Sequence, residues 1–268
     1  MNIPTRSTST PRFSIAMVNY KTAELTRNCL ELLREQLAGL DVPVWVVDNG
    51  SADASTAYLR GLDWINLIER APAAGEPGHI AHGKALDLIL ERIDTEYILL
   101  MHTDTFIYNN AVFQLLLNEC MRDENRVAAG CVEQLDRGLI RTAWRFTSRY
   151  CKHHYRRLVR AAGLPGRDPK PWKEVYLKSF CTLWNAKVMK QRGLHFCMDD
   201  RVPGYTLQDR MVEAGLAVAS ISPRRLFRYL DHIQAGTVAA CGGYAQGHRR
   251  TRMYDHALAR LNKVASYP

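Results

Sequence analysis

Membrane-spanning segments are absent from this sequence of 268 residues. Its longest apolar runs have the length of a β-strand, whereas a transmembrane helix needs about 20 consecutive apolar residues. The first residues, MNIPTRSTSTPRF, also lack the apolar core of a secretory signal. We therefore expect a cytoplasmic protein whose Ser/Thr/Pro-rich tail, residues 1–11, is disordered.

Paired cysteines are absent as well, since the seven cysteines are scattered and no two have the spacing of a CxxC motif. This excludes the usual patterns of a zinc site or a disulfide framework and fits a reducing compartment. The sequence has no Walker loop, and the turn after its first predicted strand, NYKTAE, has no GxGxxG motif. Dinucleotide binding is therefore disfavoured.

Acidic residues are missing from Arg137 to Arg167, a window that holds eight arginines and one lysine. The formal net charge of the chain is +9, so this segment carries the entire positive excess. Basic and apolar residues recur there at helical spacing, which predicts adjacent cationic and aromatic-apolar stripes. They are Arg141, Arg145, Arg149, Lys152, Arg156 and Arg160 beside Trp144, Cys151, Tyr155 and Leu158. Helices that lie in a membrane interface have this pattern, and such a face could also bind an anionic acceptor. The alternative is a core-packed helix with a solvated arginine face.

Short apolar runs alternate with helix-like segments in the first half of the chain. Strands are predicted at 13–20, 42–47, 64–68, 97–101 and 127–132, and helices at 22–38, 52–61, 79–93 and 112–121. This alternation predicts an α/β fold with a mostly parallel sheet and covering helices. The second half is less regular, with helices expected at 139–162, 186–192 and 206–214, strands at 175–183 and 216–221, and a basic helical tail at 246–268.

The segment EYILLMHTD, residues 96–104, carries the most information about function. Its apolar part reads as a buried parallel strand, and the strand ends in His102, Thr103 and Asp104. Open α/β sheets bind ligands beyond the C-terminal ends of their strands. Residues i and i+2 of a strand point to the same side, so His102 and Asp104 could share one metal ion. Alternatively, Asp104 only caps the turn and His102 lies on the surface.

A second strand end carries another carboxylate, in the segment VVDNGSADAS. Asp48 follows the apolar run and precedes an Asn-Gly turn, which predicts a carboxylate exposed above the sheet edge. A carboxylate at that edge can bind a ligand. The alternative is that Asp48 only stabilises its own turn.

Four segments together resemble the family-2 glycosyltransferases of GT-A fold, and they occur in the order and at the spacing typical of that family. They are FSIAMVNYKTAELTRNCL, PVWVVDNGSADAS, GHIAHGKALDLIL and EYILLMHTDTFI. The resemblance implies an inverting enzyme that moves a hexosyl or deoxyhexosyl group from a nucleotide-diphosphate donor to a glycan or lipid-linked acceptor. It also implies a nucleotide-sugar half at 12–135 and an acceptor-binding, catalytic half at 136–245.

The resemblance assigns the donor contacts to strand ends and to one helix. Val18, Asn19 and Tyr20 would contact the nucleotide, and Asp48 would bind its base or ribose. The helix that holds Gly78 and Lys84 would lie beside the diphosphate and the sugar.

The acidic D-x-D motif of the family binds a divalent cation, Mg²⁺ or Mn²⁺, that bridges the two phosphates. Here the motif is His102-Thr103-Asp104, so only Asp104 keeps the family carboxylate. In the segment LFRYLDHIQAGT, the resemblance implies that His232 supplies a further ligand to the metal or the diphosphate. The cation would neutralise the charge that develops on the leaving nucleoside diphosphate.

An inverting reaction also needs a general base on the acceptor hydroxyl. The family places this base near a Glu-Asp pair at the start of a helix, which corresponds here to Gln208-Asp209. Asp209 is the first candidate, and Asp199 and Asp200 are the alternates. Each of the three could instead be a helix cap or a solvated loop carboxylate.

Two other functions fit parts of the sequence. A metal-dependent nucleotidyltransferase would also gather carboxylates at strand ends. A nucleic-acid-binding protein would use the basic segment 137–167 and would need neither Asp48 nor Asp104. With the glycosyltransferase interpretation we expect no specific nucleic-acid partner, and we expect peripheral contact of the basic segment with an anionic membrane in surface polysaccharide assembly.

Overall fold

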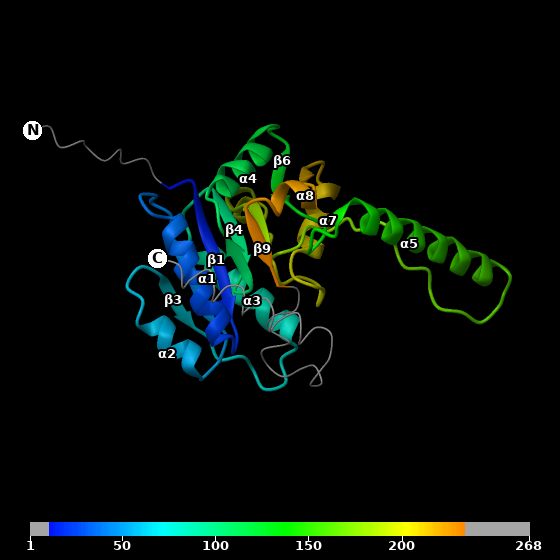
Figure 1. The fold of residues 1–268 in the computed structure, drawn as a ribbon. Helices are drawn as coiled ribbons and strands as arrows, with labels where there is room; N and C mark the ends of the chain where they lie inside the picture. The colour runs from blue at the N-terminus through cyan, green and yellow to red at the C-terminus, as the bar shows by residue number, and fades with distance from the viewer. Residues whose placement is uncertain (1–10, 234–268) are drawn as a thin grey trace, which may run out of the picture.

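The computed structural model describes residues 11–233 of the chain (Figure 1). Residues 1–10 and 234–268 lie outside the described part. The predicted disordered tail, except for its last residue, and the predicted helical tail at 246–268 therefore fall outside it too.

A seven-stranded sheet forms the centre of the fold (Figure 1). Its strands are β1 (Phe13–Asn19), β2 (Val44–Asp48), β3 (Asn66–Glu69), β4 (Tyr97–His102), β6 (Arg126–Gly130), β7 (Cys181–Asn185) and β8 (Ala217–Ser220). They lie in the order β3-β2-β1-β4-β7-β6-β8. β7 is antiparallel to its neighbours β4 and β6, and the other pairs are parallel. The mostly parallel sheet of the predicted α/β fold is thus confirmed.

Helices cover both faces of the sheet. They are α1 (Ala23–Gln36), α2 (Ala54–Arg60), α3 (Gly78–Arg92), α4 (Ala111–Met121), α6 (Ala186–Gln191), α7 (Tyr205–Glu213) and α8 (Pro223–Leu226). Side chains of α1, α2, α4 and α8 belong to one hydrophobic cluster, and those of α3, α6 and α7 belong to the other. β4 contributes to both, because successive side chains of a strand alternate between faces: Leu99 and Met101 enter the first cluster, and Ile98 and Leu100 the second.

The sequence of α1 shows why these segments are helical. Leu25, Cys29 and Leu33 are spaced four residues apart, so they share one face, and all three are fully buried. Burying an aliphatic side chain of this size contributes about 1.5–3 kcal/mol relative to leaving it exposed. The packing of this stripe against the sheet therefore decides where α1 lies.

The predicted strand at 175–183 is wrong in its bounds, because β7 begins only at Cys181. The backbone just before it bonds elsewhere: the Leu177 N–H donates to the side chain of Gln208 (3.0 Å), and the Lys178 N–H donates to the Cys131 carbonyl (2.8 Å). Three short elements were not predicted: α8, β5 (Thr105–Ile107) and β9 (Leu230–His232). Three or four residues are too few to show a hydrophobic period.

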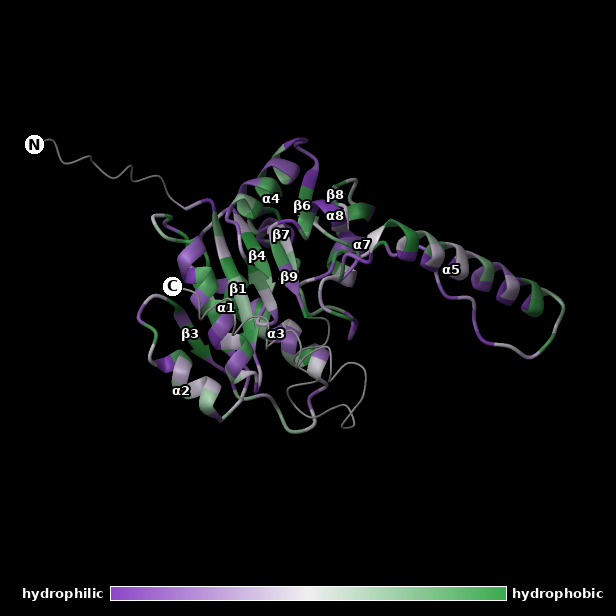
Figure 2. Cartoon of the chain, viewed as in Figure 1, coloured by the Kyte–Doolittle hydropathy of each residue, from purple (hydrophilic) through white to green (hydrophobic). Residues whose placement is uncertain are grey.

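The basic segment forms one long helix, α5 (Gly138–Ala161), which projects from the body of the molecule (Figure 1). None of its 24 residues is buried, so the alternative of a core-packed helix is wrong. Purple and green residues alternate along it in Figure 2, as expected for polar and apolar stripes. Within residues 11–233, no helix is both long enough and apolar enough to cross a bilayer.

Candidate active site

His102, Asp104 and His232 meet at the C-terminal edge of the sheet. β4 ends at His102, and a two-residue turn that contains Asp104 leads into β5. β5 pairs antiparallel with β9, in a register that sets Thr105 opposite His232. The Ile233 N–H also donates to the Asp104 carbonyl (2.9 Å). This small sheet brings His232 beside Asp104, although 128 residues separate them in the sequence.

The three side chains form a compact donor set, which we call the candidate metal site. The Oδ1 atom of Asp104 lies 3.4 Å from Nε2 of His232 and 3.8 Å from Nδ1 of His102. One ligand atom from each residue lies within 4.8 Å of the other two. The side chains of Asp104 and His232 are only 5% and 2% exposed, whereas His102 is 29% exposed and can face a ligand.

Hydrogen bonding prepares His232 to bind a cation. Its Nδ1 lies 3.0 Å from the Gln134 carbonyl, and since a carbonyl only accepts, Nδ1 carries the proton. In the neutral ring, Nε2 then directs a lone pair toward the Asp104 carboxylate. Two acceptors at that separation repel each other unless a positive charge lies between them. Metal-binding histidines are oriented by the same kind of bond to a carbonyl, so the residues present fit a divalent cation.

Two neutral imidazoles, those of His102 and His82, lie beside each other at the site. Burial lowers the pKa of His102 to about 3, although the Asp104 carboxylate opposes the shift. Burial likewise lowers the pKa of His82, on α3, to about 4. The two rings meet edge to face with their centroids 5.5 Å apart. Near neutral pH both rings are uncharged, so their nitrogens keep a lone pair for a metal or a donor for phosphate.

Sequence analysis missed several residues that build the site. His82 lies inside GHIAHGKALDLIL, the segment that the resemblance places beside the diphosphate and the sugar, so the sequence could have indicated it as a site residue. Phe180 stacks on the His232 ring at 4.5 Å between centroids, and the Ser179 hydroxyl bonds to Nε2 of His102 (2.9 Å). Gln134 contributes only its backbone carbonyl. These last three residues carried no signal, because only the folded chain brings them to the site.

Asp48 lies inside a buried hydrogen-bond network and is not exposed as predicted, since it is only 3% exposed. Its Oδ1 accepts from the Asn19 amide (2.8 Å) and from the Ser51 hydroxyl, and its Oδ2 accepts from Thr56 (2.7 Å). Asn19 itself is fully buried and also donates to Ser55 (2.8 Å). The network ties the ends of β1 and β2 to the start of α2.

The other predicted donor residues lie along the same sheet edge. Val18 pairs with His102 in the register of β1 and β4, and Tyr20 just beyond β1 is 42% exposed. The Thr103 hydroxyl, by contrast, lies 3.2 Å from that of Thr22, in the interior. Gly78 is the exposed first residue of α3.

Lys84, further along α3, belongs to a chain of charged groups. It donates to Glu76 (2.7 Å), which also accepts from Arg70 (2.5 Å), and Arg70 donates to Asn49 (2.7 Å). Hydrogen bonds from Lys84 and Arg70 lower the pKa of the Glu76 carboxyl. The chain holds the loop before α3 against the end of β2.

The candidate general bases lie at α7 or just before it. In α7, Oδ2 of Asp209 accepts from Arg201 (2.7 Å) and from the Tyr176 hydroxyl (3.1 Å). Asp199 and Asp200 are exposed, with φ values of +54° and +50°. Aspartate tolerates this left-handed conformation better than most residues. Among the contacts recorded for residues 11–233, none joins these carboxylates to the candidate metal site.

The comparison with protein families identifies the class of protein. The family described as glycosyl transferase family 2 matches residues 14–172, more than half of the chain. The protein therefore belongs to glycosyl transferase family 2 and is a glycosyltransferase. Among curated proteins, a search by sequence finds no match.

Solved structures share the fold at low sequence identity. A mannosyltransferase from Pyrobaculum calidifontis is 16% identical, with a TM-score of 0.56 over 95% of this chain and 70% of that chain. Glucosyl-3-phosphoglycerate synthase from Mycobacterium tuberculosis is 17% identical, with a TM-score of 0.50 over 88% of this chain and 82% of that chain. These likenesses concern the fold, which is the predicted GT-A fold.

Proposed function

We propose that the protein is an inverting, metal-dependent glycosyltransferase. It transfers a hexosyl or deoxyhexosyl group from a nucleotide-diphosphate sugar to a glycan or lipid-linked acceptor, in the assembly of a polysaccharide or surface glycan. The observation that carries this proposal is the convergence of His102, Asp104 and His232 at the C-terminal sheet edge of a family 2 glycosyltransferase.

The donor atoms of the site favour Mn²⁺ over Mg²⁺. Two imidazole nitrogens and one carboxylate make the set, and Mg²⁺ prefers oxygen ligands throughout. The P. calidifontis mannosyltransferase structure contains GDP-mannose and Mn²⁺, which supports the same ion and donor class here. When bound, the cation would neutralise the charge that develops on the leaving diphosphate.

The residues of the chain would bind and orient the two substrates. Tyr20 and Val18 would line the nucleotide site. Asp48 ends the neighbouring strand, and its Oδ2, which accepts one hydrogen bond from Thr56, would be the acceptor for the base or the ribose. Lys84 and Gly78 would approach the diphosphate, and Thr103 would hold the turn of the D-x-D motif. These assignments rest on their common sheet edge.

The inverting step needs one proton transfer. The acceptor hydroxyl loses its proton to a carboxylate as its oxygen attacks the anomeric carbon, and the bond to the diphosphate breaks on the opposite face. Asp209 is our first candidate for this base. Its Oδ2 is held by Arg201 and Tyr176, so Oδ1 would receive the proton. Asp199 and Asp200 remain the alternates.

The outer face of α5 would dock on an anionic membrane surface. Four of its most exposed apolar side chains share one face, and they are Ile140, Trp144, Tyr155 and Leu158, exposed by 87%, 75%, 68% and 70%. Arg141, Lys152 and Arg157 flank them, and the ion pairs recorded within residues 11–233 do not include these three. A partly apolar and cationic helix of this kind suits the headgroup region of anionic lipid. This contact would make the protein peripheral to the membrane.

The experiment that tests the function is a screen of nucleotide sugars. We expect one of them to be hydrolysed or transferred only when Mn²⁺ or Mg²⁺ is present, and Asp104→Asn to abolish the reaction. Asp41→Asn, at an exposed carboxylate away from the sheet edge, serves as the matched control and keeps the activity. Undiminished activity of a folded Asp104→Asn protein would overturn the assignment.

A further inference from the structure

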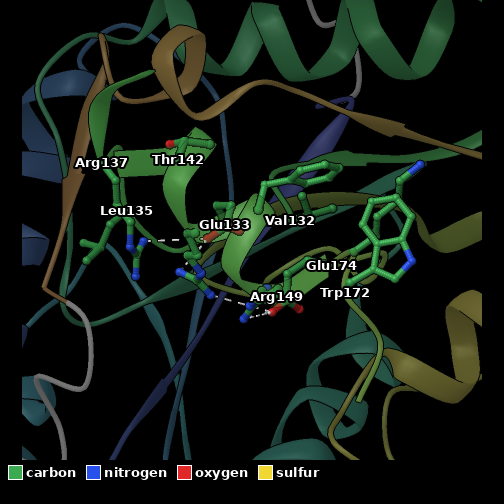
Figure 3. Close-up of a pocket in the computed structure, with 11 residues that line it drawn as sticks. Val132, Glu133, Leu135, Arg137, Thr142, Arg149, Trp172 and Glu174 are labelled. Carbon is green, nitrogen blue, oxygen red and sulfur yellow. Dashed lines mark ion pairs between the residues drawn. The ribbon is translucent and has the colours of Figure 1, made fainter. Parts of the chain in front are cut away.

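A basic cavity lies where α5 joins the body of the molecule (Figure 3). Two adjoining parts, about 210 Å³ and 160 Å³, make it up. The residues that line both parts are Val132, Glu133, Arg137, Arg145 and Glu174. The combined space suits a monosaccharide with a charged substituent, which is small compared with typical drug-sized ligands.

The lining of this cavity carries more positive than negative charge. Arg145 pairs with Glu133 (3.1 Å), and Arg149 pairs with Glu174 (2.8 Å). Lys178 also approaches Glu174 (3.4 Å). The two glutamates therefore face four cations, of which Arg137 is the fourth. Lys173 also lines the larger part, so the lining keeps an excess of three positive charges.

Of the four cations that face the two glutamates, Arg137 has the longest distance to its nearest carboxylate. Its Nη1 lies 3.7 Å from Glu133, too far for a hydrogen bond. This nitrogen is buried and has no hydrogen-bond acceptor within the described part of the chain. Burial, together with Arg145 and Arg149, lowers the pKa of Arg137, although a guanidinium stays charged at neutral pH. Burying a hydrogen-bond donor without an acceptor costs free energy. An anion in the cavity would supply the acceptor that the Arg137 guanidinium lacks.

Aromatic side chains form part of the wall of the larger cavity part, where Lys173 lies over the Trp172 ring at 4.7 Å. Trp172 and Phe146 both line the larger part of the cavity, and their rings meet edge to face at 4.9 Å between centroids. Tyr150 also meets the Trp172 ring edge to face, at 5.3 Å between centroids. A wall of this kind can pack against the apolar face of a ring-shaped ligand while the arginines hold its charge.

Two segments connect the cavity to the candidate metal site. Gln134 lines the smaller part, and its carbonyl accepts the Nδ1 proton of His232. Lys178 lines the same part, and the next residue, Ser179, bonds to His102. The cavity is therefore a direct neighbour of the site where transfer would occur. Most of its lining, from Arg137 to Lys178, belongs to the half of the chain that the family resemblance implies for the acceptor.

We propose that this cavity recognises the anionic group, a phosphate or a carboxylate, of the sugar acceptor. This inference rests on the proposed function, since it names the class of acceptor for the same site. Arg137 binds the anion, and Arg149 and Lys178 supply further positive charge in the cavity. Trp172 packs against the ring of the sugar. The acceptor would accordingly be an acidic or phosphorylated glycan unit.

Calorimetry with three matched sugars tests the inference: glucose 6-phosphate, glucuronate and glucose. We expect the wild-type protein to bind one of the two charged sugars at least about tenfold more tightly than glucose, as a charge-assisted hydrogen bond in a buried site allows. The charged sugar that binds more tightly shows whether the cavity recognises a phosphate or a carboxylate. Equal affinity for all three sugars would overturn the proposal.

Variants separate the cavity from the surface charge of α5. Arg137→Gln should lose the preference for the charged sugar, and Arg137→Lys should keep part of it. Arg157→Gln, on the outer face of the same helix, should bind the charged sugar like the wild type. An unchanged preference in a folded Arg137→Gln protein, verified by its melting temperature, would contradict the assignment.

The proposed function has its own readout in the same experiment, which is binding of UDP or GDP in the presence of Mn²⁺. We expect Arg137→Gln to leave this binding intact. If the wild type binds neither nucleotide, the proposed metal-dependent use of a uridine or guanosine diphosphate sugar fails, and with it the assignment of the cavity to an acceptor. If it binds a nucleotide but does not distinguish charged from neutral sugars, only the cavity assignment fails.

Discussion

Asp104 and its two histidines depart from the all-carboxylate motif of the family, and the departure has a chemical consequence. The first position of D-x-D is His102, and the site gains a second imidazole from His232. Nitrogen donors favour transition metals, whereas carboxylates bind Mg²⁺ in addition to transition metals such as Mn²⁺. The metal preference of the candidate site would therefore depend on these two residues.

The first prediction concerns this preference. His102→Asp restores the carboxylate and should retain or tighten metal binding, with a shift from Mn²⁺ toward Mg²⁺. His232→Ala should weaken Mn²⁺ binding by at least about tenfold, because it removes a buried ligand. Titration of Mn²⁺ followed by electron paramagnetic resonance measures both. A complete loss of binding in His102→Asp would mean that this histidine has another function.

The second prediction concerns Asp48. Asp48→Ala should raise the donor KM more than it lowers kcat, because a contact to the base or ribose acts in the ground state as well as in the transition state. It should also cost about 1–3 kcal/mol of stability, since it leaves Asn19, Ser51 and Thr56 without their acceptor.

Thr56→Val is the control for this prediction. It removes one hydrogen bond of the same network and keeps the carboxylate, so it should lower stability and leave the donor KM unchanged. Steady-state kinetics measures the donor KM, and thermal unfolding measures the stability. A pure kcat defect in Asp48→Ala would contradict the assignment.

At the scale of the elements, one carboxylate connects three of them. Glu119 in α4 is 8% exposed and faces Arg225 of α8 (2.7 Å), Arg126 of β6 (3.3 Å) and Arg122 (3.4 Å). Burial alone would raise the pKa of Glu119, but the arginines outweigh it and lower the pKa. The charge is thus stabilised by the fold, and it links α4 to β6 and α8.

The third prediction is that Glu119→Gln destabilises the protein by roughly 1–3 kcal/mol at pH 7, because it removes a buried anion that faces three arginines, of which Arg126 is itself largely buried. A carboxyl whose pKa is lowered by folding contributes fully above its unfolded pKa of about 4.3, and loses that contribution as the pH falls through the folded pKa. The difference between wild type and variant should therefore shrink below about pH 4.

Urea unfolding between pH 3 and pH 7 measures this dependence. Glu213→Gln is the matched control, since its partner Arg210 and the carboxylate are both largely exposed and such a pair contributes little. A difference for Glu119→Gln that stays constant across the range would exclude the electrostatic explanation.

At the scale of the whole molecule, α5 divides its basic residues between two surfaces. Arg145 and Arg149 turn inward to the glutamates of the cavity, and Arg160 pairs with Asp168. Arg141 and Lys152 remain on the outer side. The cationic stripe of the sequence is therefore two separate surfaces in the structure, and each can be tested without the other.

The fourth prediction is that the outer surface binds anionic membranes. Each basic residue near such a membrane contributes about 1 kcal/mol, so changing Arg141, Lys152 and Arg157 to Gln should lower vesicle partitioning by roughly 100-fold. Co-sedimentation with anionic and neutral vesicles measures it, and binding to anionic vesicles should weaken as salt increases. Arg137→Gln, inside the cavity, is the control and should bind vesicles normally.

Equal binding to anionic and neutral vesicles, or none to either, would leave the outer stripe as a solvated face. Stronger binding to nucleic acid than to vesicles at physiological salt would instead favour a nucleic-acid partner for α5.

Local patterns in the sequence determined much of this protein. Continuous apolar runs predicted β1, β2 and β4, and the helical spacing of Leu25, Cys29 and Leu33 predicted α1. The polar residues that end β4 marked the candidate site. These features could be read directly because burial against a sheet imposes a short period on neighbouring residues.

Tertiary structure decided what depends on segments that meet across long distances in the chain. The pairing of β5 with β9 places His232 beside Asp104. Because the backbone N–H groups of Leu177 and Lys178 bond outside the sheet, β7 begins later than predicted. Packing also buried Asp48 and turned Arg145 and Arg149 into the cavity. No local period encodes such contacts, because they arise from how two distant surfaces fit once the sheet has formed.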